Sequence, residues 1–292
     1  MKLGVQAFTI LDECLSDFEG TLSAVHKLGF KYMEWINVKA DQDPGLGNGL
    51  SPKEALKVFA DHDITLTGAI FVGNDTKNLL FDMDQVQRII DWYYEAGCRT
   101  LGLGDDKFLD ADFFKRRMDQ YNEIGRRCKE AGISWMYHNH FHEQQHINGR
   151  TILEQMLELT DPDLVGFDFD VYWALRGLVD PVKFIKGNPQ RIKSMHCKDF
   201  PFDKLDVVNM AKMLEIDKPL TFEDEDYYDF VGEDEFIECG QGIINWQNVV
   251  DAGNEAGCPY VFVEQDFSKY PKYECLGMSK AYLETLSGLT IR

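Results

Sequence analysis

Strand-like and helix-like segments alternate along the whole chain, and this alternation limits the folds that it can adopt. Short apolar runs of the strand type recur about eight times in 292 residues, and a segment with helical apolar spacing follows almost every one. Such alternation predicts a parallel sheet, because each helix carries the chain back to the start of the next strand. About eight units in a chain of this length favour a single domain, residues 1–292, folded as a closed (β/α)8 TIM barrel.

Apolar spacing, caps and turn residues place the individual elements. A capping box at Ser51–Glu54 opens the second helix, and Gly132 closes the fourth. The expected strands span Lys2–Thr9, Tyr32–Asn37, Thr65–Val72, Thr100–Gly104, Ser134–His140, Leu164–Tyr172, Arg191–Lys198 and Tyr260–Asp266. The other expected helices span Asp17–Leu28, Asp84–Ala96, Asp112–Ala131, Arg150–Leu159, Trp246–Ala256 and Leu276–Leu286, with one more that begins at Asp180-Pro181.

Ionisable residues gather where the last four expected strands end. The carboxyl ends of barrel strands surround one mouth, and the active site of this fold is built there from several strands at once. We therefore expect these side chains to meet in one site. The four segments are Tyr137–Glu143, Phe167–Asp170, Ser194–Asp199 and Val261–Asp266.

Asp170, His196 and Glu264 are the candidate metal ligands on the last three of these strands. A fourth ligand is expected from the end of the fifth strand, where we prefer Glu143 because it completes a carboxylate-rich set; His138 is the alternative. One imidazole with three carboxylates suits one divalent ion, Mn²⁺, Co²⁺, Mg²⁺ or Zn²⁺. The pattern does not choose among these metals.

Proton transfer is the second expected task of this site. With Glu143 as ligand, His140 is free to act as general base or acid, assisted by His138 on the same side of the strand. Lys198 lies two positions after His196 and should face the same way, so it can donate a proton or stabilise an enolate oxygen. Its alternative role is a salt bridge to Asp199 or Asp170.

Three further ionisable residues lie near the expected site. Glu34 lies on the second strand and is a candidate to reach the pocket. His142 and His146 are expected at the surface.

The residues Phe200–Cys239 interrupt the alternation between the seventh strand and its helix. Inserted loops at this position belong to the carboxyl-terminal face of a barrel, so we expect the region 200–240 to cover the mouth. Its acidic and aromatic run Glu223–Asp229 fits either a lid or a solvated loop.

Composition narrows the partners and the compartment. A net charge of −20 argues against nucleic acid and anionic membranes, which demand a basic surface. Seven cysteines without a CxxC pair are typical of a reduced, cytoplasmic chain. No apolar run approaches the about 18 residues that a membrane span needs. The sequence leaves open a homo-oligomer or a small partner subunit.

The ordered motifs from Tyr137 to Asp266 resemble a known family, the xylose isomerase-like barrels of sugar phosphate isomerases/epimerases. Its members include inosose dehydratases and isomerases, keto-sugar 3-epimerases and dehydroshikimate dehydratases. The resemblance implies a divalent metal held by Glu, Asp, His and Glu; many relatives carry the first Glu inside the fifth strand, where this chain has His138. The motifs are Tyr137–His140 with Glu143, Asp170–Trp173, Asp180-Pro181, Arg191–Asp199, Gly240–Gly242 before Trp246, and Val263–Asp266.

The resemblance implies an isomerase, epimerase or dehydratase acting on a sugar, keto-sugar or cyclitol. The metal would chelate a carbonyl and a neighbouring hydroxyl, which lowers the pKa of the adjacent C–H and stabilises an enediolate. The alternative is a lyase that cleaves 3-keto-glycosides by elimination on the same site. A metal nuclease of the apurinic-site endonuclease type needs a basic DNA face, against which the net charge argues. A non-catalytic sugar-binding barrel is the fourth hypothesis.

Overall fold

Eight parallel strands close into a barrel in the computed structural model, which describes residues 1–72, 81–104, 106–108, 110–210, 217–218 and 231–290. Neighbouring strands follow the order β1, β2, β3, β4, β5, β8, β9, β10, and β10 pairs with β1 to complete the circle. The (β/α)8 barrel expected from the sequence is thus confirmed. The strands are β1 Lys2–Gln6, β2 Tyr32–Asn37, β3 Thr65–Val72, β4 Thr100–Gly104, β5 Ser134–His138, β8 Val165–Asp170, β9 Ile192–Cys197 and β10 Tyr260–Val263.

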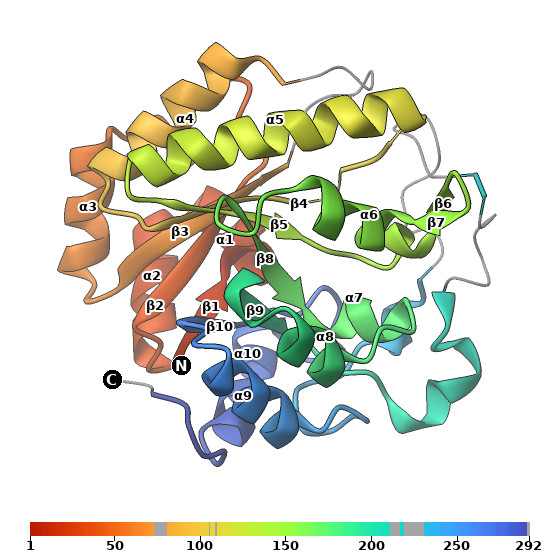
Figure 1. The fold of residues 1–292 in the computed structure, drawn as a ribbon. Helices are drawn as coiled ribbons and strands as arrows, with labels where there is room; N and C mark the ends of the chain where they lie inside the picture. Colours follow the sequence, from red (N-terminus) through yellow and green to blue (C-terminus); the bar gives the residue numbers. More distant parts are fainter. Residues whose placement is uncertain (73–80, 105, 109, 211–216, 219–230, 291–292) are drawn as a thin grey trace.

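The helices surround the barrel on its outside (Figure 1). A two-stranded hairpin, β6 (His146–Ile147) with β7 (Arg150–Thr151), lies outside the barrel sheet. None of the helices in the described ranges has the length and apolar character needed to cross a membrane. The helices are α1 Leu11–Ser16, α2 Phe18–Lys27, α3 Pro52–Asp61, α4 Met83–Glu95, α5 Ala111–Glu130, α6 Ile152–Leu159, α7 Val171–Arg176, α8 Pro181–Gly187, α9 Trp246–Glu255 and α10 Lys272–Leu283.

Alternation along β5 shows how the barrel positions its site. Trp135 and Tyr137 point outward, where both rings pack against Tyr121 of α5 at centroid distances of 6.1 and 5.9 Å. Successive side chains of a strand point to opposite faces. Met136 and His138 therefore point into the barrel, and His138 lies at the carboxyl end of the strand.

Five expected strands end earlier than the sequence indicates. β1, β5, β8, β9 and β10 end at Gln6, His138, Asp170, Cys197 and Val263, where Thr9, His140, Tyr172, Lys198 and Asp266 were expected. β5 ends at His138, so His140 does not lie on the strand; Asn139 instead exchanges two hydrogen bonds with the backbone of Asp170, and the chain turns away there. β8 ends at Asp170, whose carboxylate caps α7 by accepting a hydrogen bond from the Trp173 amide at 2.7 Å. Capping of this kind satisfies a donor that would otherwise be orphaned at a helix start.

Helix ends follow their caps. The capping box at Ser51 and Glu54 opens α3 as expected, and Gly132 adopts a positive φ of 76° just beyond α5. The last helix begins at Lys272, four residues before the expected start at Leu276, and ends at Leu283. Its first turn carries Tyr273, whose ring packs on the core although it belongs to a polar-looking segment.

The described parts of the insertion, 200–210, 217–218 and 231–240, contact the loop that follows β5 and helix α7, which follows β8 directly. An apolar cluster joins them to these two segments. Arg176 at the end of α7 binds the insertion through the Val207 and Val208 carbonyls and the Glu235 carboxylate. These contacts lie on the carboxyl-terminal side of the barrel, whereas the acidic run Glu223–Asp229 lies outside the described residues. The cluster comprises Phe141, Tyr172, Trp173, Phe200, Met210, Val231 and Phe236.

Candidate metal centre

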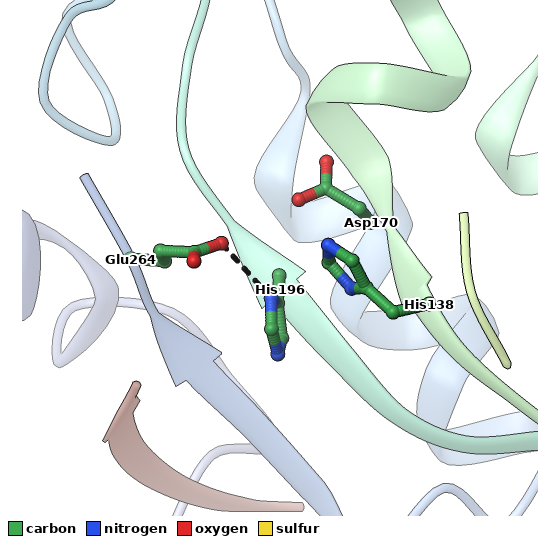
Figure 2. Close-up of side chains that lie close together, drawn as sticks. All are labelled: His138, Asp170, His196 and Glu264. Atoms are coloured by element: carbon green, nitrogen blue, oxygen red, sulfur yellow. Dashed lines mark hydrogen bonds and ion pairs between the residues drawn. The ribbon is translucent and has the colours of Figure 1, made fainter. Parts of the chain in front are cut away.

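Four side chains from neighbouring strands converge at the barrel mouth: His138, Asp170, His196 and Glu264 (Figure 2). Each offers a ligand atom, and these atoms all lie within 4.8 Å of one another. His138 ends β5, Asp170 ends β8, His196 lies on β9, and Glu264 follows β10 directly. All four are buried.

The donor chemistry of this group fits a divalent cation. Two imidazoles and two carboxylates are ligands that Zn²⁺, Mn²⁺ and Co²⁺ accept, and buried carboxylates are found paired with a cationic side chain or bound to a metal. Asp170 is held in place from its other side, because its Oδ1 accepts the Trp173 amide at 2.7 Å. Its Oδ2 lies 3.1 Å from the Lys198 ammonium.

Glu143, preferred as the first ligand from the sequence, lies in a different cluster with His140 and His142. Its carboxylate accepts hydrogen bonds from the Tyr137 hydroxyl at 2.7 Å and from the His140 amide at 2.9 and 3.0 Å. The structure thus brings His138, and not Glu143, together with the other three candidate ligands. Glu143 instead stabilises the turn after β5.

His196 is the centre of a network of carboxylates. Its Nδ1 lies 2.9 Å from Glu264 Oε2, while its Nε2 lies 2.7 Å from Glu34 Oε2 and 2.9 Å from Asp168 Oδ2. Burial alone would lower the pKa of His196, but Asp168 and Glu264 raise it well above its usual value. Burial and the nearby Asp168 carboxylate raise the pKa of Glu34 to about 7.

Lys198 lies among three carboxylates and is itself 1% exposed. Its Nζ is 2.5 Å from Glu264, 2.8 Å from Asp266 and 3.1 Å from Asp170. Burial alone would lower the pKa of Lys198, but Asp170 and Asp266 raise it well above its usual value. Lys198 is therefore a charged ammonium in contact with two of the four candidate ligands, Asp170 and Glu264, and the salt bridge to Asp170 that the sequence allowed is present.

His140 lies beyond β5 beside the candidate ligands, with its ring 4.9 Å from that of His138 and 5.4 Å from that of Trp173. Burial, with His138 nearby, holds the pKa of His140 well below its usual value. The imidazole is therefore neutral. His142 was expected at the surface, but it is 1% exposed and bonds the Asp106 carbonyl at 2.9 Å; the turn that Glu143 stabilises folds it inward.

Three residues of the network were not singled out from the sequence. Asp168, Asp266 and Gln6 contact His196, Lys198 and Glu34 respectively. The first two had a signal, because period-two alternation places Asp168 on the side of Asp170 and Asp266 on the side of Glu264. Gln6 had no such signal. Neither did a further residue, Asp106, which lies in the loop between β4 and α5 and contacts His142 in the turn after β5.

Known proteins resemble this chain over most of its length. The inosose dehydratase of Geobacillus kaustophilus is 27% identical over 307 residues, covering 89% of this chain and 94% of that protein. A sugar phosphate isomerase/epimerase from Parabacteroides distasonis superposes with a TM-score of 0.79 at 23% identity, covering 99% of this chain and 95% of that one. The IOLI protein, whose crystal structure contains a bound zinc atom, superposes with a TM-score of 0.66 at 15% identity, covering 98% of this chain and 97% of that one.

A family model describes the same relationship at the level of sequence. It represents the xylose isomerase-like TIM barrel and matches residues 22–272. The match includes seven of the eight barrel strands and all four residues that converge at the mouth. The chain therefore belongs to the xylose isomerase-like TIM barrel family.

Proposed function

We propose that the protein is a metal-dependent enzyme that removes a proton next to the carbonyl of a keto-sugar or cyclitol ketone. The observation that carries the proposal is the convergence of His138, Asp170, His196 and Glu264, with ligand atoms within 4.8 Å of one another. The neutral imidazole of His140 and the charged ammonium of Lys198 lie beside these ligands. A divalent ion held there, Zn²⁺, Mn²⁺, Co²⁺ or Mg²⁺, would supply the positive charge that polarises a substrate carbonyl.

His140 is the proposed base. Its imidazole lies next to the ligand group, 4.9 Å from the His138 ring, and Trp173 on its other side offers an apolar wall for a ring-shaped substrate. Positioned general bases contribute about 10²–10⁴-fold to rate. His140 would take the proton from the carbon next to the carbonyl and hold it on a ring nitrogen.

Lys198 is the proposed acid. The relative named inosose dehydratase favours dehydration, in which a β-hydroxyl must leave after the C–H bond breaks. The Lys198 ammonium can give its proton to that oxygen, so that the C–O bond breaks, a C=C bond forms and water departs. The proton on His140 then returns to Lys198 through solvent, which closes the cycle. Isomerisation or epimerisation shares the first step but returns the proton to carbon.

The chain is an enzyme of the sugar- or cyclitol-converting kind, like its relatives, and the proposed location is the cytoplasm. Its seven cysteines are buried free thiols, which suits a reducing compartment. Elimination from a 3-keto-glycoside would use the same two groups with a glycoside oxygen as the leaving group. It is therefore the second candidate reaction of the same site.

The test is solvent deuterium exchange measured together with metal content. Purified protein, with its metal determined by elemental analysis, is incubated with inososes, keto-sugars and 3-keto-glycosides in D₂O. For at least one substrate, we expect deuterium to appear on the carbon next to the carbonyl, or water or the alcohol of the glycoside to be released. His196→Ala should lose metal and exchange together, whereas the matched variant His146→Ala, on the hairpin, should keep both. Exchange that persists in metal-free protein would refute the metal-dependent mechanism.

A further inference from the structure

Asp168 occupies the middle strand between the two strands that carry the imidazole ligands. β8 pairs with β5 on one side, where Asp168 lies opposite His138, and with β9 on the other, where it lies opposite Ser194. Residues paired across parallel strands face the same side of the sheet. Asp168 therefore points into the barrel one layer below Asp170, and it is fully buried.

The Asp168 carboxylate contacts both imidazoles through one oxygen. Its Oδ2 lies 2.9 Å from His196 Nε2 and 3.4 Å from His138 Nδ1. Its Oδ1 accepts a hydrogen bond from the Ser194 hydroxyl at 2.5 Å, which fixes the rotation of the carboxylate. One anchored carboxylate thus lies close to two imidazoles, one on each of the strands that flank β8. Among the described residues, His196 Nε2 has Glu34 Oε2 as its hydrogen-bond partner, whereas Asp168 Oδ2 and His138 Nδ1 have none and face each other.

The two contacts involve different ring nitrogens. On His196 the contacted atom is Nε2, which leaves Nδ1 facing Glu264 at 2.9 Å. On His138 the contacted atom is Nδ1, so the other nitrogen, Nε2, is on the side of the ring that faces Asp170 (Figure 2). A metal-bound imidazole commonly donates its second N–H to a carboxylate, which fixes the tautomer and the ring orientation.

We propose that Asp168 is a positioning residue that sets the tautomers of both histidine ligands in opposite senses, so that His138 binds the metal through Nε2 and His196 through Nδ1. This inference rests on the proposed metal site. Glu34 reinforces only one of the two histidines, because its Oε2 lies 2.7 Å from His196 Nε2. Asp168 and Glu34 therefore form a matched pair for mutation, one acting on both ligands and the other on one.

A competing geometry is present in the same residues. Glu34, Asp168 and His196 also offer ligand atoms within 4.8 Å of one another, so an ion could lie on the inner side of His196. In that case Asp168 would be a ligand itself. The two arrangements differ in which His196 nitrogen carries the metal and in whether His138 takes part.

The test is the protonation state of each ring nitrogen in protein labelled with ¹⁵N-histidine and loaded with one equivalent of Zn²⁺. Long-range ¹H–¹⁵N correlation spectra distinguish a protonated from a metal-bound nitrogen. We expect a protonated Nδ1 and a metal-bound Nε2 on His138, and the reverse on His196. This measurement on the wild-type protein is independent of whether any variant folds.

The variants separate positioning from ligation. Asp168→Asn should lower zinc affinity about 10–100-fold, the range for outer-shell partners of metal ligands, and disturb the nitrogen signals of both histidines. Glu34→Gln should disturb His196 alone. Ser194→Ala, which releases the Asp168 carboxylate, should lower zinc affinity by a smaller factor.

Four results would overturn the inference. Zinc on His138 Nδ1 or His196 Nε2 would reject it while leaving the proposed function intact. An Asp168→Asn variant that loses as much affinity as Asp170→Asn would make Asp168 a ligand, and one with unchanged affinity would remove its role. A wild-type protein that binds no divalent metal would instead refute the proposed function, and this inference with it.

Discussion

Replacing His138 and Glu143 separately decides which of them completes the metal site. The sequence favoured Glu143, whereas the structure brings His138 to the other three ligands. Four-ligand zinc sites bind with apparent free energies of about 10–16 kcal/mol, or about 3 kcal/mol for each ligand. His138→Ala should therefore weaken zinc binding by about a hundredfold or more, since about 1.4 kcal/mol corresponds to a factor of ten.

Glu143→Gln should act on stability and not on metal. The carboxylate accepts the Tyr137 hydroxyl at 2.7 Å and the His140 amide at 2.9 Å, both in a buried setting. A glutamine keeps one acceptor oxygen but turns an NH₂ group toward one of these donors. Loss of a buried partner costs about 1–3 kcal/mol, so the free energy of unfolding should fall by that amount.

The assays are a zinc titration against a competing chelator and urea denaturation of the metal-free proteins. His146→Ala serves as the control, because His146 lies on the β6–β7 hairpin and its side chain is 30% exposed. The reasoning is refuted if Glu143→Gln loses zinc affinity by a hundredfold while its stability is unchanged. It is equally refuted if His138→Ala binds zinc like the wild type.

Three further predictions address catalysis, the insertion and the metal. His140→Ala should keep stoichiometric metal but lose about 10²–10⁴-fold in solvent deuterium exchange; unchanged exchange would exclude it as the base, and loss of metal would make it a ligand. Arg176→Met leaves the Glu235 carboxylate and the Tyr172 hydroxyl without their buried partner, so urea denaturation should show a loss of about 3–5 kcal/mol. Dialysis against a chelator should lower the free energy of unfolding by about 4 kcal/mol relative to protein held at a thousandfold excess over Kd, measured as a lower thermal midpoint.

The barrel and the gathering of most of the candidate site residues could be predicted because they depend on local patterns. The expected strands at Tyr32–Asn37, Thr65–Val72 and Thr100–Gly104 agree with β2, β3 and β4 in both bounds. Asp170, His196 and Glu264 follow from the rule that functional side chains lie at the carboxyl ends of barrel strands. Each of these statements needs only the residues of one segment.

The choice between His138 and Glu143 could not be made in this way. Both lie near the end of β5, and alternation along a longer strand would have kept His138 and His140 on one face. The strand ends because Asn139 pairs with the backbone of Asp170, 31 residues later in the chain. Glu143 then folds back onto the His140 amide. A contact between distant segments therefore decides which of the two side chains joins the candidate ligands, and no local pattern contains it.

Strand register imposes a second constraint of this kind. Along β8 and β9, Phe167 lies opposite Ile192, but Asp168 lies opposite Ser194, so Lys193 is an extra residue in β9. Such a bulge shifts every later residue by one position, and a shift of one reverses which face a side chain meets. Without it, Asp170 would pair with Met195 and not with His196. One extra residue, invisible to a period-two count along either strand, thus aligns two of the four candidate ligands on the inner face of the barrel.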